Sequence, residues 1–386
     1  MYYLLPLFQL LTVSQQYPSF EQQTIDEQVS IGYGLAIGDV DGDGRPDILL
    51  ADKKAFVWYR NGDWKRFVMV ENLTEHDNVC IAARDIDGDG KVEVAVGAQW
   101  NPGETSDTVQ SGAVHYLVRP EDPTQQWTPV KLHHEPTVHR MRWAKAEEGK
   151  YHLIVLPLHG RGNKDGEGKG VKVIAYEKPD DPYAPWQHWV IDESMHLTHN
   201  LDVNEVGDRE EVYVSGKEGV KVFFYLRNSW RSNWLIKGDA FSEVRVGRAE
   251  NGVPMLAAIG PLHGNVVAAY VPRAGAQKLN RAARVVIDED LREGHALAVA
   301  DFVGSGRDQI VAGWRNPDAA GYIGIKIYIP FNPLWEAWNT KAIDIGDDMA
   351  CEDLTVADLN GDGKLDIIAS GRSTHNLKIY WNRTGE

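Results

Sequence analysis

Cysteine, positive charge and long apolar runs are scarce in this chain of 386 residues. Its two cysteines, Cys80 and Cys351, are too few for a disulfide-stapled scaffold or a four-cysteine zinc site. Lys and Arg number 40 against 56 Asp and Glu, which gives a formal charge of −16. Such an acidic surface repels phosphate backbones, so we expect no nucleic-acid partner. The composition is otherwise typical of a soluble globular protein.

The apolar run near the N-terminus covers residues 2–13, which is too short a segment to span a bilayer. We therefore expect no membrane span. Residues 1–16 are interpreted as a secretory signal peptide, although no Lys or Arg precedes the run, and the protein is expected to be secreted. An ordinary apolar N-terminal strand is the alternative. The Asn-x-Thr sequons at Asn72 and Asn382 agree with secretion.

Long helical patterns are also absent. What recurs is an alternating apolar strand, an acidic glycine-rich turn and a second apolar strand. Seven copies align on the residue that opens the turn, with spacings of 46, 60, 60, 43, 53 and 57 residues. These residues are Asp39, Asp85, Lys145, Glu205, Arg248, Asp301 and Asp358. A sevenfold repeat of about fifty residues predicts an all-β fold, a seven-bladed β-propeller over residues 17–386.

Most copies are followed by a similar outer strand, but the last copy lacks one because the chain stops at Glu386. A matching segment, FEQQTIDE, occupies residues 20–27 at the other end of the chain. We expect this N-terminal strand to complete the last blade and to close the ring without a free edge.

Three of the turns carry side-chain oxygens at positions 1, 3, 5 and 9, separated by glycines that permit a tight turn. Oxygen ligands at this spacing predict a structural Ca²⁺ or Mg²⁺ site, and a metal-free Asx turn is the alternative. The predicted ligands are Asp39, Asp41, Asp43 and Asp47 in blade one, Asp85, Asp87, Asp89 and Glu93 in blade two, and Asp358, Asn360, Asp362 and Asp366 in blade seven. In blade six, Val303 and Ser305 replace two ligands, which argues against a metal there.

The repeats are of the FG-GAP or VCBS type, and they resemble the propellers of integrin α-chains and of many secreted carbohydrate-active proteins. This resemblance covers nearly the whole chain but implies little about function.

The face of the ring opposite the acidic turns is where we expect the chemistry. The first strand of each propeller blade lines the central channel. Six positions before the turn-opening residue, the blades carry Tyr33, Val79, His139, His199, Ser242, His295 and Glu352. We interpret His139, His199, His295 and Glu352 as ligands of one zinc ion, because histidines at equivalent inner positions converge. Separate polar groups bonded to loop carbonyls are the alternative.

Two further histidines, His159 and His263, follow the second strand of their blades in the repeated sequence LHG and are expected to overlook the same funnel. We interpret them, with His76 and Arg140, as catalytic residues. Aromatic and cationic side chains around a funnel are typical of a sugar-binding surface. The predicted substrate-binding residues are Trp100, Trp314, Arg315, Arg372 and Tyr33.

Residues 76–107, 132–145, 157–173 and 198–203, including PLHGRGNKDGEGKGVKV and THNLDV, resemble the propeller domain of the fungal aldos-2-ulose dehydratase (1,5-anhydro-D-fructose dehydratase) family. The resemblance implies a seven-bladed propeller with a zinc-dependent dehydratase site, and hence a hydro-lyase acting on a keto-sugar such as 1,5-anhydrofructose or glucosone. The family's long form adds cupin and lectin-like domains after the propeller. This sequence ends at the propeller, so we expect the isomerase half of that chemistry to be missing.

The candidate residues suit such a reaction. A zinc ion held by histidines would polarise a carbonyl and acidify the neighbouring C–H bond. Neutral His159 or His263 would take the proton, and Arg140 would stabilise the enolate oxygen. Two other classes are left open: a propeller-fold polysaccharide lyase that eliminates next to a uronate, and a non-catalytic carbohydrate-binding or adhesion module. The expected partner is a small sugar or oligosaccharide, and a homodimer is left open.

Overall fold

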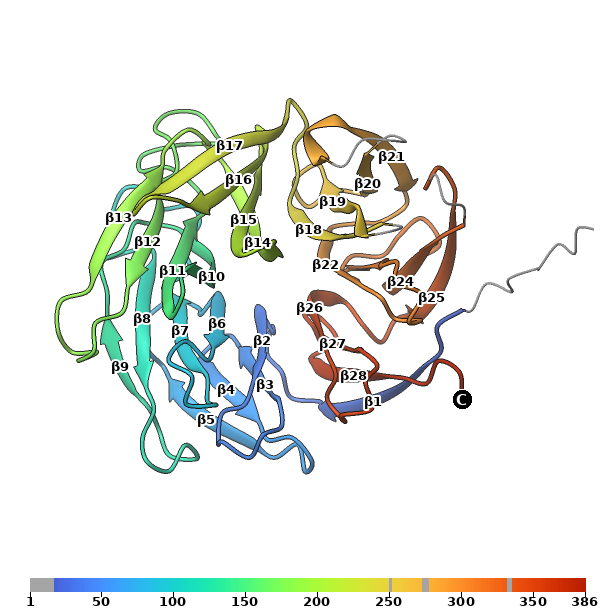
Figure 1. The fold of residues 1–386 in the computed structure, drawn as a ribbon. Coiled ribbons are helices and arrows are strands. Elements are labelled where there is room, and N and C mark those ends of the chain that lie inside the picture. Colours follow the sequence, from blue (N-terminus) through green and yellow to red (C-terminus); the bar gives the residue numbers. More distant parts are fainter. Residues whose placement is uncertain (1–16, 250–251, 273–277, 332–334) are drawn as a thin grey trace, which may run out of the picture.

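The computed structural model describes residues 17–249, 252–272, 278–331 and 335–386. The predicted signal peptide, residues 1–16, lies outside these ranges. Seven four-stranded sheets follow one another around a central axis (Figure 1), which confirms the seven-bladed propeller. Within the described ranges, none of the helical segments has the length and apolar character needed to cross a membrane.

Each blade is an antiparallel sheet that runs from an inner strand at the channel to an outer strand. Blade one contains β2 (Gly34–Gly38), β3 (Asp47–Ala51), β4 (Ala55–Tyr59) and β5 (Arg66–Glu71). Blade two contains β6 (Cys80–Arg84), β7 (Glu93–Ala98), β8 (Ala113–Val118) and β9 (Thr128–Lys131). Blade three contains β10 (Val138–Glu147), β11 (Lys150–Pro157), β12 (Val173–Glu177) and β13 (Gln187–Asp192).

The remaining blades follow the same order around the ring. Blade four contains β14 (Thr198–Val206), β15 (Arg209–Gly216), β16 (Gly219–Tyr225) and β17 (Trp230–Lys237). Blade five contains β18 (Glu243–Arg248), β19 (Pro254–Gly260), β20 (Val266–Pro272) and β21 (Ala282–Asp288), with the short 3-10 helix η2 (Leu279–Arg281) before β21. Blade six contains β22 (Gly294–Ala300), β23 (Gln309–Trp314), β24 (Ile323–Pro330) and β25 (Trp338–Gly346). Blade seven contains β26 (Cys351–Ala357), β27 (Asp366–Gly371), β28 (Asn376–Asn382) and the N-terminal strand β1 (Phe20–Asp26).

Strand β1 pairs antiparallel with β28 and confirms the predicted closure of the ring by the N-terminal segment. The register begins with Phe20 opposite Asn382, and Figure 1 shows the blue strand β1 alongside the red strand β28. The Asn382 side chain is fully buried and donates to the Phe302 carbonyl at 2.9 Å. This second sequon is therefore inaccessible to a glycan in the closed ring.

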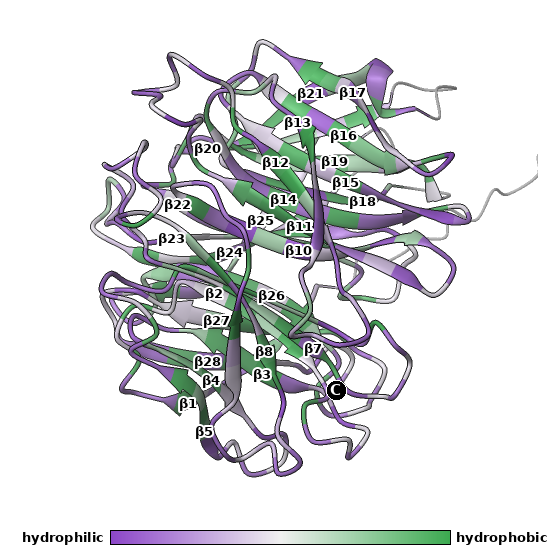
Figure 2. Ribbon diagram, turned by 90° about the vertical axis from the view of Figure 1, so that its left-hand side faces the viewer, coloured by the Kyte–Doolittle hydropathy of each residue, from purple (hydrophilic) through white to green (hydrophobic). Residues whose placement is uncertain are grey.

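Apolar contacts between neighbouring blades form the core. Strands β3 and β7 are buried at every residue. One cluster joins Leu49 and Trp58 of blade one to Val94 and Val96 of blade two, and comparable clusters join other neighbours. In Figure 2 the strands are mostly apolar and the loops at their ends mostly polar. Burial of these blade faces is thus the main driving force that holds the ring together.

The three acidic turns share one pattern of hydrogen bonds. In blade one, the Asp39 carboxylate accepts the amide N–H groups of Gly42 and Gly44, both at 2.7 Å. Asp85 and Asp358 accept the corresponding pairs of glycine amides in their own turns. The φ angles of Gly42 and Gly44 are +83° and +82°, a region in which side chains other than glycine are strained. The turn conformation therefore depends on the sequence pattern itself.

Three acidic side chains converge in each of two turns. One oxygen of each lies within 4.8 Å of the others in the groups Asp39, Asp41 and Asp43 of blade one and Asp85, Asp87 and Glu93 of blade two. Burial and the charge of Asp43 raise the pKa of Asp41. Asp89 instead lies 3.3 Å from Arg119, and in blade seven Asn360 donates to Asp362 at 3.1 Å. A structural cation in these turns stays a prediction.

Position nine of the turn has a different role in blades one and seven. Asp47 accepts the amides of Val40 at 2.9 Å and Asn61 at 2.7 Å, and Asp366 accepts the corresponding two amides of blade seven. Burial raises the pKa of Asp47 to about 7. The two carboxylates therefore anchor backbone within their blades, and their role as metal ligands stays a prediction.

Replacing Asp41 and Asp43 together by alanine should abolish a cation site in blade one while keeping the Asp39 hydrogen bonds. We expect Ca²⁺ to raise the melting temperature of the wild type, and to raise that of the variant less, because a ligand of the folded state alone stabilises it. Calorimetry over a calcium series measures the difference. Alanine at both Glu121 and Asp122 removes the same charge from an exposed loop and serves as the control. An unchanged calcium response in the turn variant would contradict the prediction.

His152 in β11 is a buried histidine remote from the channel mouth. Its side chain lies among Trp189, Tyr225 and Trp230, and the Trp230 indole N–H donates to its Nδ1 at 3.0 Å. Burial lowers the pKa of His152 from its ordinary value of 6.5 to about 4. The folded state therefore favours the neutral ring.

Because the unfolded state binds the proton more tightly, His152 should make stability rise between pH 4 and 6.5. His152→Phe keeps an aromatic ring that cannot titrate. We expect it to reduce the gain in unfolding free energy between pH 4 and 7 by about 3 kcal/mol. Urea unfolding across this range measures the change. Parallel pH profiles for the two proteins would disprove the assignment.

Candidate active site

The inner strands place the histidines selected from the sequence at equivalent positions. His139, His199 and His295 are each the second residue of an inner strand, namely β10, β14 and β22, and Glu352 is the second residue of β26. All four are buried. His263 comes from the loop between β19 and β20 and has a φ angle of +49°, an uncommon conformation for a residue with a side chain.

Three of these histidines form one cluster. A ring nitrogen of each of His199, His263 and His295 lies within 4.8 Å of the other two, and Nε2 of His199 is 2.7 Å from Nε2 of His263. Their ring centroids are separated by 4.7 to 5.2 Å. Two ring nitrogens at this distance need a proton or a cation between them, because their lone pairs would otherwise repel. We call these three residues the histidine cluster.

The other ring nitrogen of the inner-strand histidines faces an acceptor. Nδ1 of His295 lies 2.6 Å from the Glu352 carbonyl, and Nδ1 of His139 lies 2.7 Å from the His199 carbonyl. Nδ1 of His199 lies 3.1 Å from a carboxylate oxygen of Glu243. An acceptor at this position favours a hydrogen on Nδ1 in each ring, which places the lone pair on Nε2. This is the arrangement that orients metal-binding histidines.

The surroundings favour neutral imidazoles. Burial, followed by the charges of Arg140 and Arg315 respectively, holds the pKa of His139 and of His295 well below the usual range. His263 is exposed by surface area, but protein atoms crowd its ring, and this desolvation with the nearby His199 lowers its pKa to about 3. Neutral rings at physiological pH can act as metal ligands or as proton acceptors.

Glu352 has a different role from the one expected. Its two carboxylate oxygens accept from Arg315 at 2.7 Å and from Arg372 at 2.9 Å. Glu352 is not among the side chains whose ligand atoms converge with those of the histidine cluster. The residue instead fixes two guanidinium groups at the wall of the funnel, and its carbonyl also holds His295.

A second part of the wall centres on Tyr33. The Arg372 guanidinium lies over the Tyr33 ring, 5.4 Å from its centroid, and the Tyr33 hydroxyl donates to Asp77 at 3.1 Å. Burial and the adjacent Asp77 raise the pKa of Tyr33 to about 12, so it stays a neutral hydrogen-bonding group. Lys54 lies 3.7 Å from Asp77 and compensates part of its charge.

The remaining predicted residues separate into two groups. Trp100 stacks on His139 with a centroid distance of 5.0 Å, and the amide of the half-buried His76 donates to Gln99. Trp314 and Arg140 instead donate to backbone carbonyls of the protein itself. Trp314 is fully buried in the core between blades five and six and donates to the Tyr322 carbonyl at 2.9 Å, so it cannot stack on a sugar.

Arg140 and His159 also lie outside the histidine cluster. Arg140 is buried and donates to the carbonyls of Val79 and His139, both at 3.2 Å. His159 is half-buried, and its Nδ1 has no hydrogen-bond partner among the described residues. Burial lowers the pKa of His159. Its neutral ring therefore keeps the properties of a proton acceptor.

Glu243 is the site residue that sequence reasoning missed. It is fully buried and directly follows Ser242, the blade-five member of the aligned inner positions. Burial alone would raise its pKa, but its contact with His199 and the nearby charges of Arg245 and Arg140 together lower it. The only sequence signal was a glutamate next to the aligned position.

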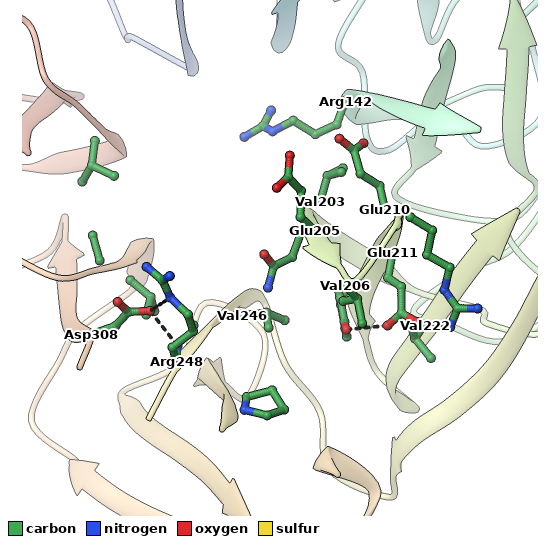
Figure 3. Close-up of a pocket in the computed structure, with 18 of the residues that line it drawn as sticks. Arg142, Val203, Glu205, Val206, Glu210, Glu211, Val222, Val246, Arg248 and Asp308 are labelled. Atoms are coloured by element: carbon green, nitrogen blue, oxygen red, sulfur yellow. Dashed lines mark hydrogen bonds and ion pairs between the residues drawn. The ribbon is translucent and has the colours of Figure 1, made fainter. Parts of the chain in front are cut away.

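A cavity of about 1820 Å³ opens at the other end of the channel. Its lining includes the turns at Gly207, Gly252, Gly304 and Gly363, and none of the cluster histidines. Figure 3 shows Arg142, Glu205 and Glu210 around this cavity, and Arg248 beside Asp308. The cavity is therefore separate from the histidine cluster.

Comparisons with known proteins agree with this architecture. The family model described as aldos-2-ulose dehydratase, beta-propeller domain, matches residues 111–273, and models of FG-GAP-like and FG-GAP repeats match residues 28–96 and 81–117. Aldos-2-ulose dehydratase of Phanerodontia chrysosporium is 22% identical over 317 residues, which is 75% of this chain and 34% of that protein. The chain thus spans about a third of the length of this curated relative.

Similar solved structures share the fold alone. A chain of the mitotic checkpoint complex has 10% identity and a TM-score of 0.57, with coverage of 98% of this chain and 97% of that chain. BBS1N in complex with ARL6DN, soaked with mercury, has 12% identity and a TM-score of 0.57, with coverage of 96% and 98%. Function must therefore be argued from the site.

Alanine substitutions should show which histidines bind the same metal ion. The sequence grouped His139 with His199 and His295, whereas the structure groups His263 with them. If the three residues serve one zinc ion, we expect His199→Ala, His263→Ala and His295→Ala each to lose most of it, with losses that do not add. His139→Ala should keep its zinc. Metal content after dialysis measures this, and melting temperatures verify folding. Zinc lost from His139→Ala but retained by His263→Ala would restore the sequence-based grouping.

Proposed function

We propose that the protein is a zinc-dependent sugar dehydratase, a carbon–oxygen hydro-lyase that acts on a keto-sugar such as 1,5-anhydrofructose or glucosone. The observation that carries this proposal is the convergence of three imidazoles, His199, His263 and His295, at the mouth of the channel. Similarity to the aldos-2-ulose dehydratase propeller, which covers His199 and His263, supports the reaction class.

The donor set fits a catalytic zinc ion. Such sites use three protein ligands and leave one position for water or substrate. Nδ1 of His199 faces the Glu243 carboxylate and Nδ1 of His295 faces a backbone carbonyl, so their Nε2 atoms would be the ones to hold a metal. A zinc ion held there would supply Lewis-acid polarisation of a substrate carbonyl, which acidifies the neighbouring C–H bond.

The proton acceptor would be a neutral histidine beside the cluster. His139 has its hydrogen on Nδ1, its Nε2 lone pair free and its ring stacked on Trp100. It would accept the proton from the carbon next to the carbonyl, a C=C bond would form, and the β-hydroxyl would take up a proton and leave as water. His159 is the second candidate for the same role.

The charged wall would bind and orient the sugar. Arg315 and Arg372 are fixed by Glu352, so their remaining N–H groups are held in place for sugar oxygens. Tyr33 adds a neutral hydroxyl and Trp100 an aromatic face. Arg140, which contacts backbone carbonyls, would act at a distance by keeping His139 and His295 neutral.

Incubation of the zinc-loaded protein with 1,5-anhydrofructose and with glucosone tests the proposal. An absorbance increase from the conjugated enone is expected, lost after chelation and recovered with zinc. Arg372→Met should mainly raise KM, because it removes a substrate contact and no ligand. Turnover of a uronic polymer instead would indicate a polysaccharide lyase. Binding of sugars without turnover would indicate a non-catalytic module. Either outcome would reject the dehydratase.

A further inference from the structure

Blade five differs from its neighbours at the histidine cluster. Blades three, four and six place a histidine at the second position of the inner strand, whereas the aligned residue of blade five is Ser242. Blade five nevertheless supplies two groups that contact the His199 ring. His263 faces Nε2 at 2.7 Å, and Glu243 faces Nδ1 at 3.1 Å. The His199 ring is therefore held from both ends by one neighbouring blade.

The Glu243 carboxylate is itself fixed in position. Its side chain is fully buried, and its Oε2 accepts from the Asn200 amide at 2.5 Å. The Asn200 carbonyl oxygen accepts in turn from the amide of Leu201 at 2.8 Å, which sets the direction of the Asn200 side chain. The Arg245 guanidinium lies 3.8 Å from the carboxylate. Glu243 cannot turn away from His199 without breaking these contacts.

The remaining oxygen and the histidine nitrogen have each other as partner. Oε1 of Glu243 and Nδ1 of His199 are buried and lie 3.1 Å apart, and neither atom makes a well-aligned hydrogen bond with any described residue, so this close contact is the one that each has. An unpaired buried carboxylate oxygen or ring N–H is destabilising, because nothing replaces its lost contact with water. The contact therefore favours a hydrogen on Nδ1, which forces the lone pair to Nε2, the atom that faces His263 and the cluster.

We propose that Glu243 is the positioning residue of the histidine cluster. It holds the ring of His199 in the orientation and tautomer that a metal ligand needs, and it supplies a buried negative charge beside the three imidazoles of the cluster. This role rests on the proposed function for its metal, but the control of the His199 tautomer can be measured without one. Asn200 takes part by fixing the carboxylate.

Glu243→Gln gives the sharpest test because glutamine has the same shape without the charge. Its amide can donate to Nδ1, which would move the ring hydrogen to Nε2 and block the metal-facing lone pair. We expect zinc affinity, measured by chelator competition, to fall about 10- to 100-fold. In the zinc-free protein, nitrogen-15 NMR of the histidines should show His199 protonated on Nδ1 in the wild type and on Nε2 in the variant.

Glu210→Gln is the matched control. Glu210 is also a buried carboxylate, but it pairs with Arg84 at 2.6 Å and accepts the Lys145 amide beside the cavity at the other end of the channel. It should lower stability and leave both zinc affinity and the His199 signal unchanged. Glu243→Asp, which keeps the charge, should give a zinc affinity between those of Glu243→Gln and the wild type, and it serves if the glutamine variant does not fold.

The outcomes separate this inference from the proposed function. If the wild type binds no zinc, the proposed metal centre fails, while the NMR comparison still tests Glu243. A His199 tautomer that is the same in the wild type and in Glu243→Gln would overturn the positioning role. So would equal zinc affinities in the wild type, Glu243→Gln and Glu243→Asp.

Discussion

The pairing of β1 with β28 is the interaction on which the rest of the structure depends. It joins the two ends of the chain in one sheet, so that the seventh blade has four strands like the others. A ring closed in this way has no free sheet edge at the junction. It also holds the inner strands at fixed angles to one axis. Side chains at equivalent positions of these strands then meet, although His139 and His199 are 60 residues apart in the chain.

The two ends of the channel have different tasks. At one end, glycine-rich acidic turns organise backbone amides around Asp39, Asp85 and Asp358, which shapes the blades. At the other end, inner strands and loops bring histidines together, with their Nδ1 atoms close to carbonyl and carboxylate oxygens. Structural support and candidate chemistry are thus separated along the channel axis. A ligand bound at the histidine end therefore need not change the conformation of the acidic turns.

The charged groups near the histidine cluster affect the position and the protonation of its imidazole rings. Glu352 accepts from two arginines, and Glu243 accepts from Asn200 and lies 3.1 Å from His199, so both carboxylates are held in place beside the cluster. Arg140 and Arg315 contribute positive potential that disfavours imidazolium. Buried charges are tolerated here because each has partners. The similarity to solved structures at 10 to 12% identity concerns the fold and gives no information about these site residues.

The sequence by itself determined the ring. Period-two alternation, turn glycines and the outer-strand pattern act locally, so they predicted seven blades, the N-terminal closure and the equivalent places of His139, His199 and His295. Tertiary structure alone decided which side chains meet. Trp314 could be either a sugar platform or a core residue, and packing between blades buried it. From the sequence, Glu352 was a possible metal ligand, but in the folded chain it forms ion pairs with Arg315 and Arg372. Glu243 reaches His199 across a blade boundary, and no local pattern encodes such a contact, because its geometry depends on how two blades pack.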